Sequence, residues 1–322
     1  MKTDVIPLGT ASAVPTDERH LSALAVERKG QVLLFDCGEG TQYRLREAGL
    51  SWARIEAIFV THLHGDHCYG LPGLLSTMEL QQRADPVTLV LPPGGPGMLR
   101  AVPGATPARL SFPVHVVEAD AAGTLGTVYE TDEIAVEARR LDHREAFTMG
   151  FRVAERTRPG RFDPERARAL GVPEGPAFGR LQNGCPVTTP DGTTVRPGQV
   201  LGPPRPGVVA AYVTDTRPCA GGRALAEEAD LLYHDATFAD DHAARADETG
   251  HSTARQAATV AREAGATRLL LGHLSARYPD PAPQEREARS VFPAAEVAEE
   301  LRRYELDPRA QQPDPVGPAA ES

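Results

Sequence analysis

The sequence predicts an α/β protein built as an αββα sandwich, in which two β-sheets pack face to face and helices cover their outer sides. The chain has 322 residues, and 41% of them are hydrophobic, which is enough to bury a sizeable core. Apolar β-type runs alternate with amphipathic helical stretches, and they do so in two batches. Two helix-covered sheets accommodate that order better than one parallel sheet does.

Each predicted element has a local reason. In residues 22–36, two apolar runs flank Lys29-Gly30, a pair suited to the tight turn of a hairpin. Residues 251–265 show a helical period, with Ser252 or Thr253 as a possible N-cap and Gly265 at the end. The other predictions follow the same patterns: strands at 56–62, 112–119, 134–141, 148–155, 207–215, 230–236 and 267–274, and helices at 40–49, 70–83 and 221–229.

The segment between the two batches has a different composition. Eighteen of the 51 residues from Arg156 to Pro206 are Gly or Pro, against 41 of the other 271, so we expect it to lie outside the sandwich. Its eight arginines and four acidic residues give a net charge of +4, which leaves −14 on the rest of the chain. The sequence therefore predicts one domain at 1–306 with an inserted flexible arm at about 156–206; a mobile linker is the alternative. Residues 307–322 have little to bury and are expected to be disordered.

Composition narrows the classes of function. The four cysteines are scattered without a CxxC pair, which favours a reducing compartment, the cytoplasm, over a disulfide scaffold. No run of about 18 apolar residues occurs, so we expect no membrane partner. The net charge of −10 means that any nucleic-acid site must be a local positive island, and the arm is such an island.

The stretch THLHGDHCYG carries the clearest chemical signal. His62 and His64 alternate at the end of a predicted strand, so both side chains leave on one face, and the break at Gly65 lets Asp66 and His67 turn toward the same point. Imidazole and carboxylate suit Zn²⁺ and its neighbours, whereas Ca²⁺ and Mg²⁺ prefer oxygen ligands. Surface histidines on a loop would explain one of these residues but not four at this spacing.

Three more candidate ligands follow predicted strands. His143 in RRLDHRE, Asp215 in YVTDTRP and His273 in LLLGHLS each come directly after an apolar run. Any one of them could be an ordinary polar residue at a strand end. Their joint occurrence favours convergence at one edge of a sheet.

With these motifs in place, the chain resembles a known family. PLGTASAVP, FDCGEGTQ, THLHGDH followed by GLPGLL, LDH, GVPEGPAFGRLQNG, TDTRPC, HDAT, GHSTARQAA and GHLSARY are similar to ribonuclease Z, the transfer-RNA 3′-end endonucleases of the metallo-β-lactamase superfamily. The resemblance runs from about Ile6 to about Pro293. HxHxDH alone would indicate only the superfamily, whereas the arm segment and GHST make the assignment narrow.

The resemblance implies a site with two zinc ions that are bridged by Asp215. It implies that Asp66, besides being a ligand, accepts the proton of the attacking water. It further implies that His251 of GHST stabilises the phosphate or protonates the leaving oxygen. Asp36 would support the site without being a ligand. The implied ligands are His62, His64 and His143 for one zinc, Asp66, His67 and His273 for the other, and Asp215 for both.

The resemblance also implies partners: precursor tRNA as substrate and a homodimer, in which the arm of one subunit clamps the tRNA while the other subunit cuts. Two departures from the family pattern stand out. The family's HEAT motif reads HDAT, so Asp235 is one methylene shorter than the glutamate that would orient His251. Asp17-Glu18 stand where the family often has a basic loop that touches RNA, and their charges would repel phosphate.

Two other functions stay open at this point. A dizinc phosphodiesterase or hydrolase of small esters would use the same metals but would have no use for an arginine-rich arm. An RNA-binding protein with a structural metal would need a closed site of four protein ligands, and a carboxylate bridge speaks against that.

Overall fold

The computed structural model describes residues 2–102, 109–120 and 126–306. The chain divides into two compact units. The first is built from Met1–Ala154 and Val208–Asp307, and the second is described over residues 155–207. The tail expected to be disordered, 307–322, lies outside the described residues.

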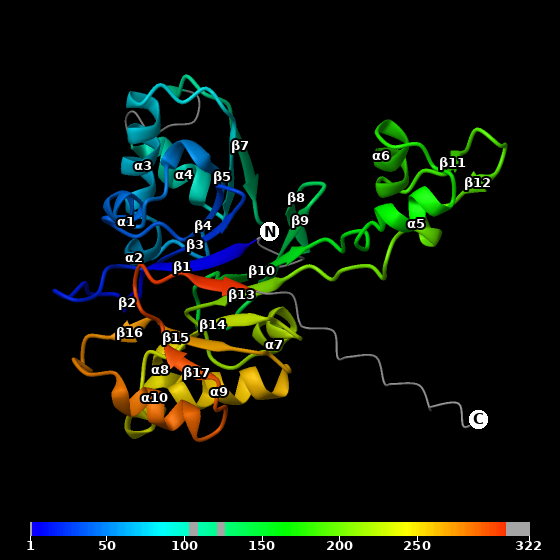
Figure 1. Ribbon diagram of the computed structural model, residues 1–322. Coiled ribbons are helices and arrows are strands. Elements are labelled where there is room, and N and C mark those ends of the chain that lie inside the picture. The colour runs from blue at the N-terminus through cyan, green and yellow to red at the C-terminus, as the bar shows by residue number, and fades with distance from the viewer. Residues whose placement is uncertain (1, 103–108, 121–125, 307–322) are drawn as a thin grey trace, which may run out of the picture. The chain divides into compact units, whose positions relative to one another are not determined.

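Two seven-stranded sheets form the centre of the first unit (Figure 1). The first sheet has the order β18-β1-β3-β4-β5-β6-β7, and the second has the order β17-β15-β14-β13-β10-β9-β8. The strands of the first sheet are β1 (Thr3–Gly9), β3 (Ala23–Arg28), β4 (Gln31–Phe35), β5 (Ile55–Phe59), β6 (Val87–Leu91), β7 (Val114–Glu118) and β18 (Tyr304–Leu306). Those of the second are β8 (Thr127–Glu130), β9 (Ile134–Arg140), β10 (Met149–Glu155), β13 (Val209–Val213), β14 (Leu231–Asp235), β15 (Leu269–Gly272) and β17 (Ala295–Val297). A short parallel pair, β2 (Ala11–Ser12) with β16 (Leu274–Ser275), lies apart from both sheets.

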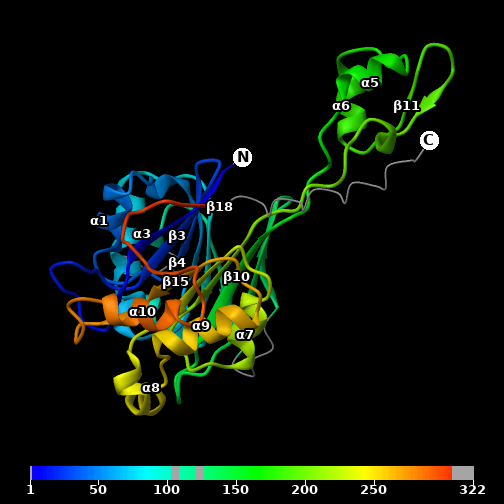
Figure 2. The same cartoon turned by 60° about the horizontal axis from the view of Figure 1, so that its bottom comes forward.

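Helices cover the outer side of each sheet, which gives the four layers that the sequence predicts (Figures 1 and 2). The helices over the first sheet are α1 (Thr41–Glu47), α3 (Gly70–Leu80) and α4 (Gly95–Ala101). Those over the second are α7 (Ala220–Ala226), α9 (Ala254–Glu263) and α10 (Ala282–Arg289). The αββα expectation is confirmed.

The alternation of side chains along the strands produces three core layers. In β4, Leu33 and Phe35 face the second sheet, while Val32 and Leu34 face the helices. Phe35 stacks on Phe59 of β5 with ring centres 4.7 Å apart. Because the central strands are buried on both faces, they read as nearly continuous apolar runs.

Local signals account for the predicted element boundaries. Lys29 and Gly30 have φ of 54° and 77°, the positive values that a two-residue hairpin turn requires. The Thr253 side chain accepts a hydrogen bond from the Gln256 backbone N–H, and the Gln256 side-chain oxygen accepts one from the Thr253 N–H, so Thr253 is the N-cap of α9.

The second unit has a small core of its own, so the Gly/Pro-rich segment is folded and is not a featureless linker. Asp163 caps α5 by accepting a hydrogen bond from the Arg166 N–H at 2.9 Å. Phe162 and Phe178 pack with ring centres 5.0 Å apart. The elements are α5 (Pro164–Ala169), α6 (Pro176–Gln182), β11 (Val187–Thr188) and β12 (Thr194–Val195), around the buried residues Ala167, Val172, Leu181, Val187, Val195 and Val200.

Among the described residues, no helix is both long and apolar enough to cross a membrane. Cys37, Cys68, Cys185 and Cys219 are free thiols, and the first two are buried behind the candidate site.

Candidate metal centre and active site

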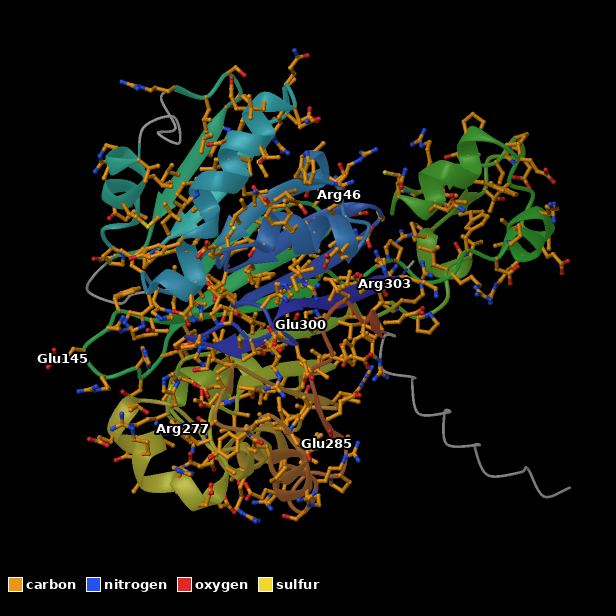
Figure 3. All side chains as sticks on the ribbon, turned by 90° about the vertical axis from the view of Figure 1, so that its left-hand side faces the viewer. Arg46, Glu145, Arg277, Glu285, Glu300 and Arg303 are labelled. Carbon is orange, nitrogen blue, oxygen red and sulfur yellow. The ribbon has the colours of Figure 1, made fainter. Side chains whose placement is uncertain are left out.

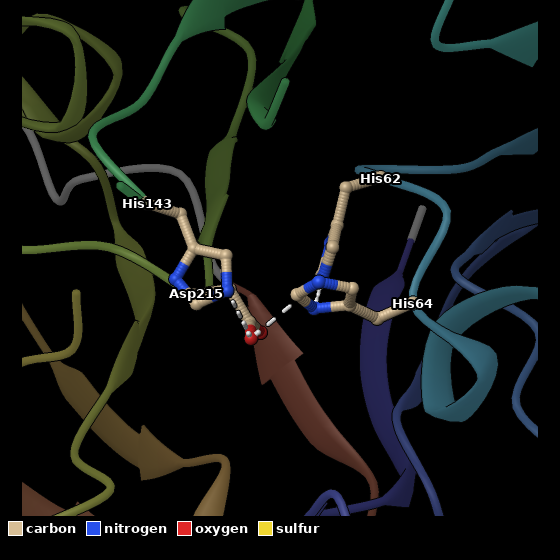
Figure 4. Close-up of side chains that lie close together, drawn as sticks. All are labelled: His62, His64, His143 and Asp215. Carbon is tan, nitrogen blue, oxygen red and sulfur yellow. Dashed lines mark hydrogen bonds and ion pairs between the residues drawn. The ribbon is translucent and has the colours of Figure 1, made fainter. Parts of the chain in front are cut away.

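The candidate ligands lie where strands of both sheets end. His62 and His64 follow β5, and the short helix α2 (Gly65–Cys68) presents Asp66 and His67. His143 follows β9, Asp215 follows β13, and His273 follows β15. The structure therefore brings together all seven residues that the sequence analysis singles out as ligands, at one edge of the sandwich (Figure 4 shows four of them).

The donor atoms form three groups, of which the third, made of Asp215, His251 and His273, shares residues with the other two. The donors of His62, His64, His143 and Asp215 all lie within 4.8 Å of one another, and so do those of Asp66, His67 and His273. Asp215 connects the two groups, because its two oxygens face different ones. Its Oδ1 lies 3.8 Å from His62 Nε2 and 3.7 Å from His143 Nε2, whereas its Oδ2 lies 3.1 Å from His67 Nε2 and 3.2 Å from His273 Nε2.

Hydrogen bonds at Nδ1 fix the ring orientation of three histidines. His143 Nδ1 donates to the Gly250 carbonyl at 2.9 Å, and His67 Nδ1 donates to Asp36 Oδ2 at 2.7 Å. His273 Nδ1 donates to the Thr237 hydroxyl at 3.0 Å. With Nδ1 engaged in each ring, Nε2 is the atom left to bind a metal and points toward the ligand cluster, which is how proteins orient a histidine ligand.

Asp36 anchors this arrangement from behind. Its carboxylate is fully buried and accepts hydrogen bonds from His67 Nδ1, from the Thr61 N–H at 2.8 Å and from the Tyr212 hydroxyl at 3.0 Å. The Thr61 hydroxyl also lies 3.0 Å from both Asp36 oxygens, so it donates to them and accepts from His62 Nδ1 at 2.9 Å. Asp36 thereby orients two candidate ligands without being one.

The donor set fits metal ions. Nε2 of His67 and Nε2 of His273 are buried and form no hydrogen bond with any described residue. Ion-pair contacts with Asp66 and Asp215 reach these two atoms, and a bound metal ion would satisfy both. Burial lowers the pKa of His67, but Asp215 and Asp36 raise it well above its ordinary value. For Asp215, burial raises the pKa, but His273 and His67 bring it well below its ordinary value. The cluster thus attracts positive charge, and metal cations would replace protons there.

His251 lies beside the cluster on a separate support. Its Nδ1 donates to Asp235 Oδ2 at 2.8 Å, and its ring is 5.2 Å from that of His273 and 4.8 Å from that of His143. Asp235, although shorter than the family's glutamate, reaches His251 directly. Burial lowers the pKa of His251, but Asp235 raises it to about 9, so the ring is a cation at neutral pH.

A pocket of about 430 Å³ opens onto the cluster. Several of its wall residues are not among those predicted from the sequence: Ser12, Ala13, Arg144, Glu145, Ala146 and Thr249. Only their position within PLGTASAVP or next to the LDH and GHST motifs could have indicated them. Arg144 is the one Lys or Arg among the described residues that line this pocket.

Comparisons with known proteins find relatives that match nearly the whole chain. A ribonuclease Z of Salinibacter ruber (strain DSM 13855 / M31) is 98% identical to this chain over 322 residues, covering 100% of both chains. A ribonuclease Z of Gemmatimonas aurantiaca is 45% identical over 302 residues, 93% of this chain and 94% of the other. The crystal structure of human tRNase Z, short form (ELAC1), aligns with a TM-score of 0.65 at 28% identity, covering 95% of this chain and 100% of that one.

Two further matches do not identify the family: one supports only the fold, and the other covers only part of the chain. The metallo-beta-lactamase fold protein YhfI from Bacillus subtilis aligns with a TM-score of 0.66 at 15% identity, over 95% of this chain and 100% of that one, and supports the fold alone. A family model described as anti-Pycsar protein Apyc1 matches residues 3–99, less than a third of the chain. Because the full-length relatives match nearly the whole chain, the chain belongs to the ribonuclease Z family, hydrolytic endoribonucleases of the metallo-β-lactamase superfamily.

Proposed function

We propose that this chain is a dizinc endoribonuclease that removes the 3′ trailer from precursor tRNA, leaving a 3′-hydroxyl on the tRNA and a 5′-phosphate on the trailer. The observation that carries the proposal is Asp215, whose two oxygens face two different groups of imidazoles. A carboxylate that turns one oxygen toward each group could contribute to binding a metal ion in each of them.

Zinc is the metal that the donors favour, because the set is rich in imidazole and contains only two carboxylates. His62, His64 and His143 would hold one ion, Asp66, His67 and His273 the other, and Asp215 both. When bound, the two ions would lower the pKa of a water molecule and offset the negative charge on the phosphate.

The chain's own residues would handle the protons. Asp66 lies at the pocket, and although burial raises its pKa, hydrogen bonds from His273 and His67 hold that pKa below its usual range. Its carboxylate is therefore ionised, and its place at the pocket is what supports it as the group that would accept a proton from the attacking water. His251, protonated at neutral pH, would donate a proton to the departing 3′ oxygen.

The second unit would serve as the substrate-binding arm inserted into a single catalytic domain. Its residues 156–206 carry a net charge of +4 in a chain whose remainder carries −14, and Arg161 and Arg166 both lie beside a surface hollow of that unit. A folded tRNA needs such a positive surface, because neutralising phosphates supplies much of the affinity for nucleic acids.

The partners follow from the same proposal. We expect a homodimer, and the exposed Tyr43 and Tyr69 on adjoining helical segments of the first unit offer apolar area for a subunit contact. Precursor tRNA is the substrate, and tRNA maturation would take place in the cytoplasm.

The test is incubation of purified protein with a 3′-extended precursor tRNA, followed by mapping of the cut and of the end groups. Elemental analysis should find two zinc ions per chain. Asp215→Ala should abolish cleavage and reduce metal content, because both ions lose a shared ligand. Full activity in that variant would refute the site, and hydrolysis of small phosphodiesters without tRNA cleavage would favour the small-ester alternative.

A further inference from the structure

Glu300 lies far from the metal ligands in sequence, yet it binds the loop that borders them. Its side chain is 8% exposed and lies where the N-terminal and C-terminal segments of the first unit meet (Figure 3). Oε1 accepts hydrogen bonds from the Thr10 N–H at 2.9 Å, the Thr10 hydroxyl at 3.1 Å and the His20 N–H at 2.8 Å. Oε2 lies 3.1 Å from His20 Nδ1 and 2.8 Å from Arg44 Nη2.

These contacts tie together the two ends of one loop, residues 10–20. The Ala11 N–H donates to the His20 carbonyl at 2.8 Å, which closes the neck of the loop. The Leu274 N–H donates to the Thr10 carbonyl at 2.8 Å and so joins the neck to the residue that follows His273. A carboxylate that accepts this many hydrogen bonds is held rigidly in place, because breaking any one of these bonds would leave a partly buried polar group unpaired.

The same loop reaches the metal site at its other end. Ser12 and Ala13 form part of the pocket wall, and the Ala13 N–H donates to Asp66 Oδ2 at 3.0 Å. This oxygen also lies 3.4 Å from His67 Nε2 and 3.6 Å from His273 Nε2, so it is the oxygen that faces the second group of donors. Ala13 holds a φ of 59°, a conformation that a non-glycine residue keeps only where its surroundings fix it.

We infer that Glu300 is a positioning residue for the second group of donors, Asp66, His67 and His273. Because Glu300 binds both ends of loop 10–20, it keeps the Ala13 N–H in its hydrogen bond to Asp66 and so fixes the orientation of this ligand. The inference rests on the proposed two-metal function. Residues that orient a ligand from outside typically change metal affinity by about 10- to 100-fold when they are lost. Glu300 would do so through the loop backbone, without touching metal or substrate.

Three variants test this role. Glu300→Ala should lower the affinity for one of the two zinc ions by about 10- to 100-fold in competition with a chelator, and anomalous diffraction should show that the ion beside Asp66 leaves first. Glu300→Gln keeps an oxygen for Thr10 and His20 but loses the charge opposite Arg44, so it should retain most of the metal affinity while losing thermal stability.

The matched control is Glu296→Gln. Glu296 lies on β17, and its carboxylate forms ion pairs with Arg268 Nη2 at 2.9 Å and Arg302 Nη1 at 3.2 Å. Neither arginine lines the pocket. This variant should lose stability and keep both metals. If Glu300→Ala does not fold, His20→Ala removes one tie of the loop and should shift the metal affinity in the same direction by a smaller factor.

The possible outcomes separate this inference from the proposed function. Wild-type protein that binds fewer than two metals or leaves precursor tRNA uncut contradicts the function itself. Wild-type protein that behaves as proposed, together with unchanged metal affinity in Glu300→Ala or His20→Ala, overturns only the role of Glu300. An equal loss of metal in Glu296→Gln would also overturn it, because the effect would then reflect general destabilisation.

Discussion

Replacing Asp235 with asparagine should separate proton donation by His251 from metal binding. Asp235 is fully buried, and its two oxygens serve different donors. Oδ1 accepts from the Thr237 N–H at 2.9 Å and the Thr237 hydroxyl at 2.8 Å, and Oδ2 accepts from the Thr216 N–H at 3.1 Å and from His251 Nδ1 at 2.8 Å. Asparagine has the same shape, but only one of its two terminal atoms can accept a hydrogen bond.

The expected magnitude follows from this geometry. If the amide oxygen keeps both Thr237 bonds, the amide NH₂ faces His251, whose Nδ1 must then present a lone pair while Nε2 keeps the only ring proton. Burial, which lowers the pKa of His251, is no longer opposed by the Asp235 charge that raises it to about 9. The ring becomes neutral and a far weaker acid, so the rate at neutral pH should fall by about 10²- to 10⁴-fold, the usual worth of a general acid.

Single-turnover cleavage of a 3′-extended precursor tRNA, measured from neutral pH to well above 9, is the assay. Because the pKa of His251 is raised to about 9, the active protonated form is present below that pH, and the wild-type rate should fall as the pH rises through it. In Asp235→Asn the fall should move to lower pH. A substrate whose leaving 3′ oxygen is replaced by sulfur needs no proton and should be cleaved at similar rates by both proteins.

Asp235→Glu is the matched control, because it keeps the charge and restores the acid of the family's motif. It should keep the pH profile and lose about 1–3 kcal/mol of stability, since a methylene is added at a fully buried position. An Asp235→Asn protein that cleaves the natural substrate at the wild-type rate would refute the acid role of His251. Loss of metal from this variant would show instead that Asp235 supports the ligands.

Further variants test the arm, the dimer and the pocket wall. Replacing Thr157–Arg205 with a short Gly-Ser linker should leave two bound metals and hydrolysis of a small synthetic phosphodiester intact. The affinity for precursor tRNA and its salt dependence should fall, because fewer phosphates are contacted. Unchanged tRNA cleavage would show that the arm does not take part in substrate binding. Mixing this deletion with Asp215→Ala chains should recover cleavage if one subunit's arm serves its partner's site, and no recovery would contradict that arrangement. Arg144→Ala should weaken precursor binding and reduce the salt slope by about one; the exposed Arg262→Ala on α9 is the control, and an equal effect there would contradict a phosphate contact at Arg144.

Much of this site could be predicted because its signals are local. Four of the seven candidate ligands stand in one stretch of six residues, and His143, Asp215 and His273 each follow a strand that its apolar run already predicts. The short Asp235 could not be evaluated from the sequence, because whether it reaches His251 depends on how β14 and the loop before α9 pack.

Other parts depend on contacts that leave no local signal. The predicted elements do not include β1, β6, β8, β17 and β18 of the two large sheets. In β1 the reason is local, because Pro7 lowers strand propensity and the register shifts between Pro7 and Gly9. Glu300 is another case, since its partners Thr10 and His20 lie 290 and 280 residues away. A single glutamate gives no indication of such a role until the fold brings Glu300 next to Thr10 and His20.

The backbone itself also marks the site in a way that the sequence does not. Among the described residues, nine that are not glycine have positive φ, and more than half of them line or support the ligand cluster: Ala13, Asp36, Arg144, Asp215 and His273. Each such conformation costs of order 1 kcal/mol or more. Glycine would relieve this strain, but glycine at Asp36, Asp215 or His273 would remove the side chain on which the site depends. These turns direct Asp215 and His273 into the ligand cluster and Asp36 onto the back of His67, so the fold bears a cost in stability that only the chemistry of the site explains.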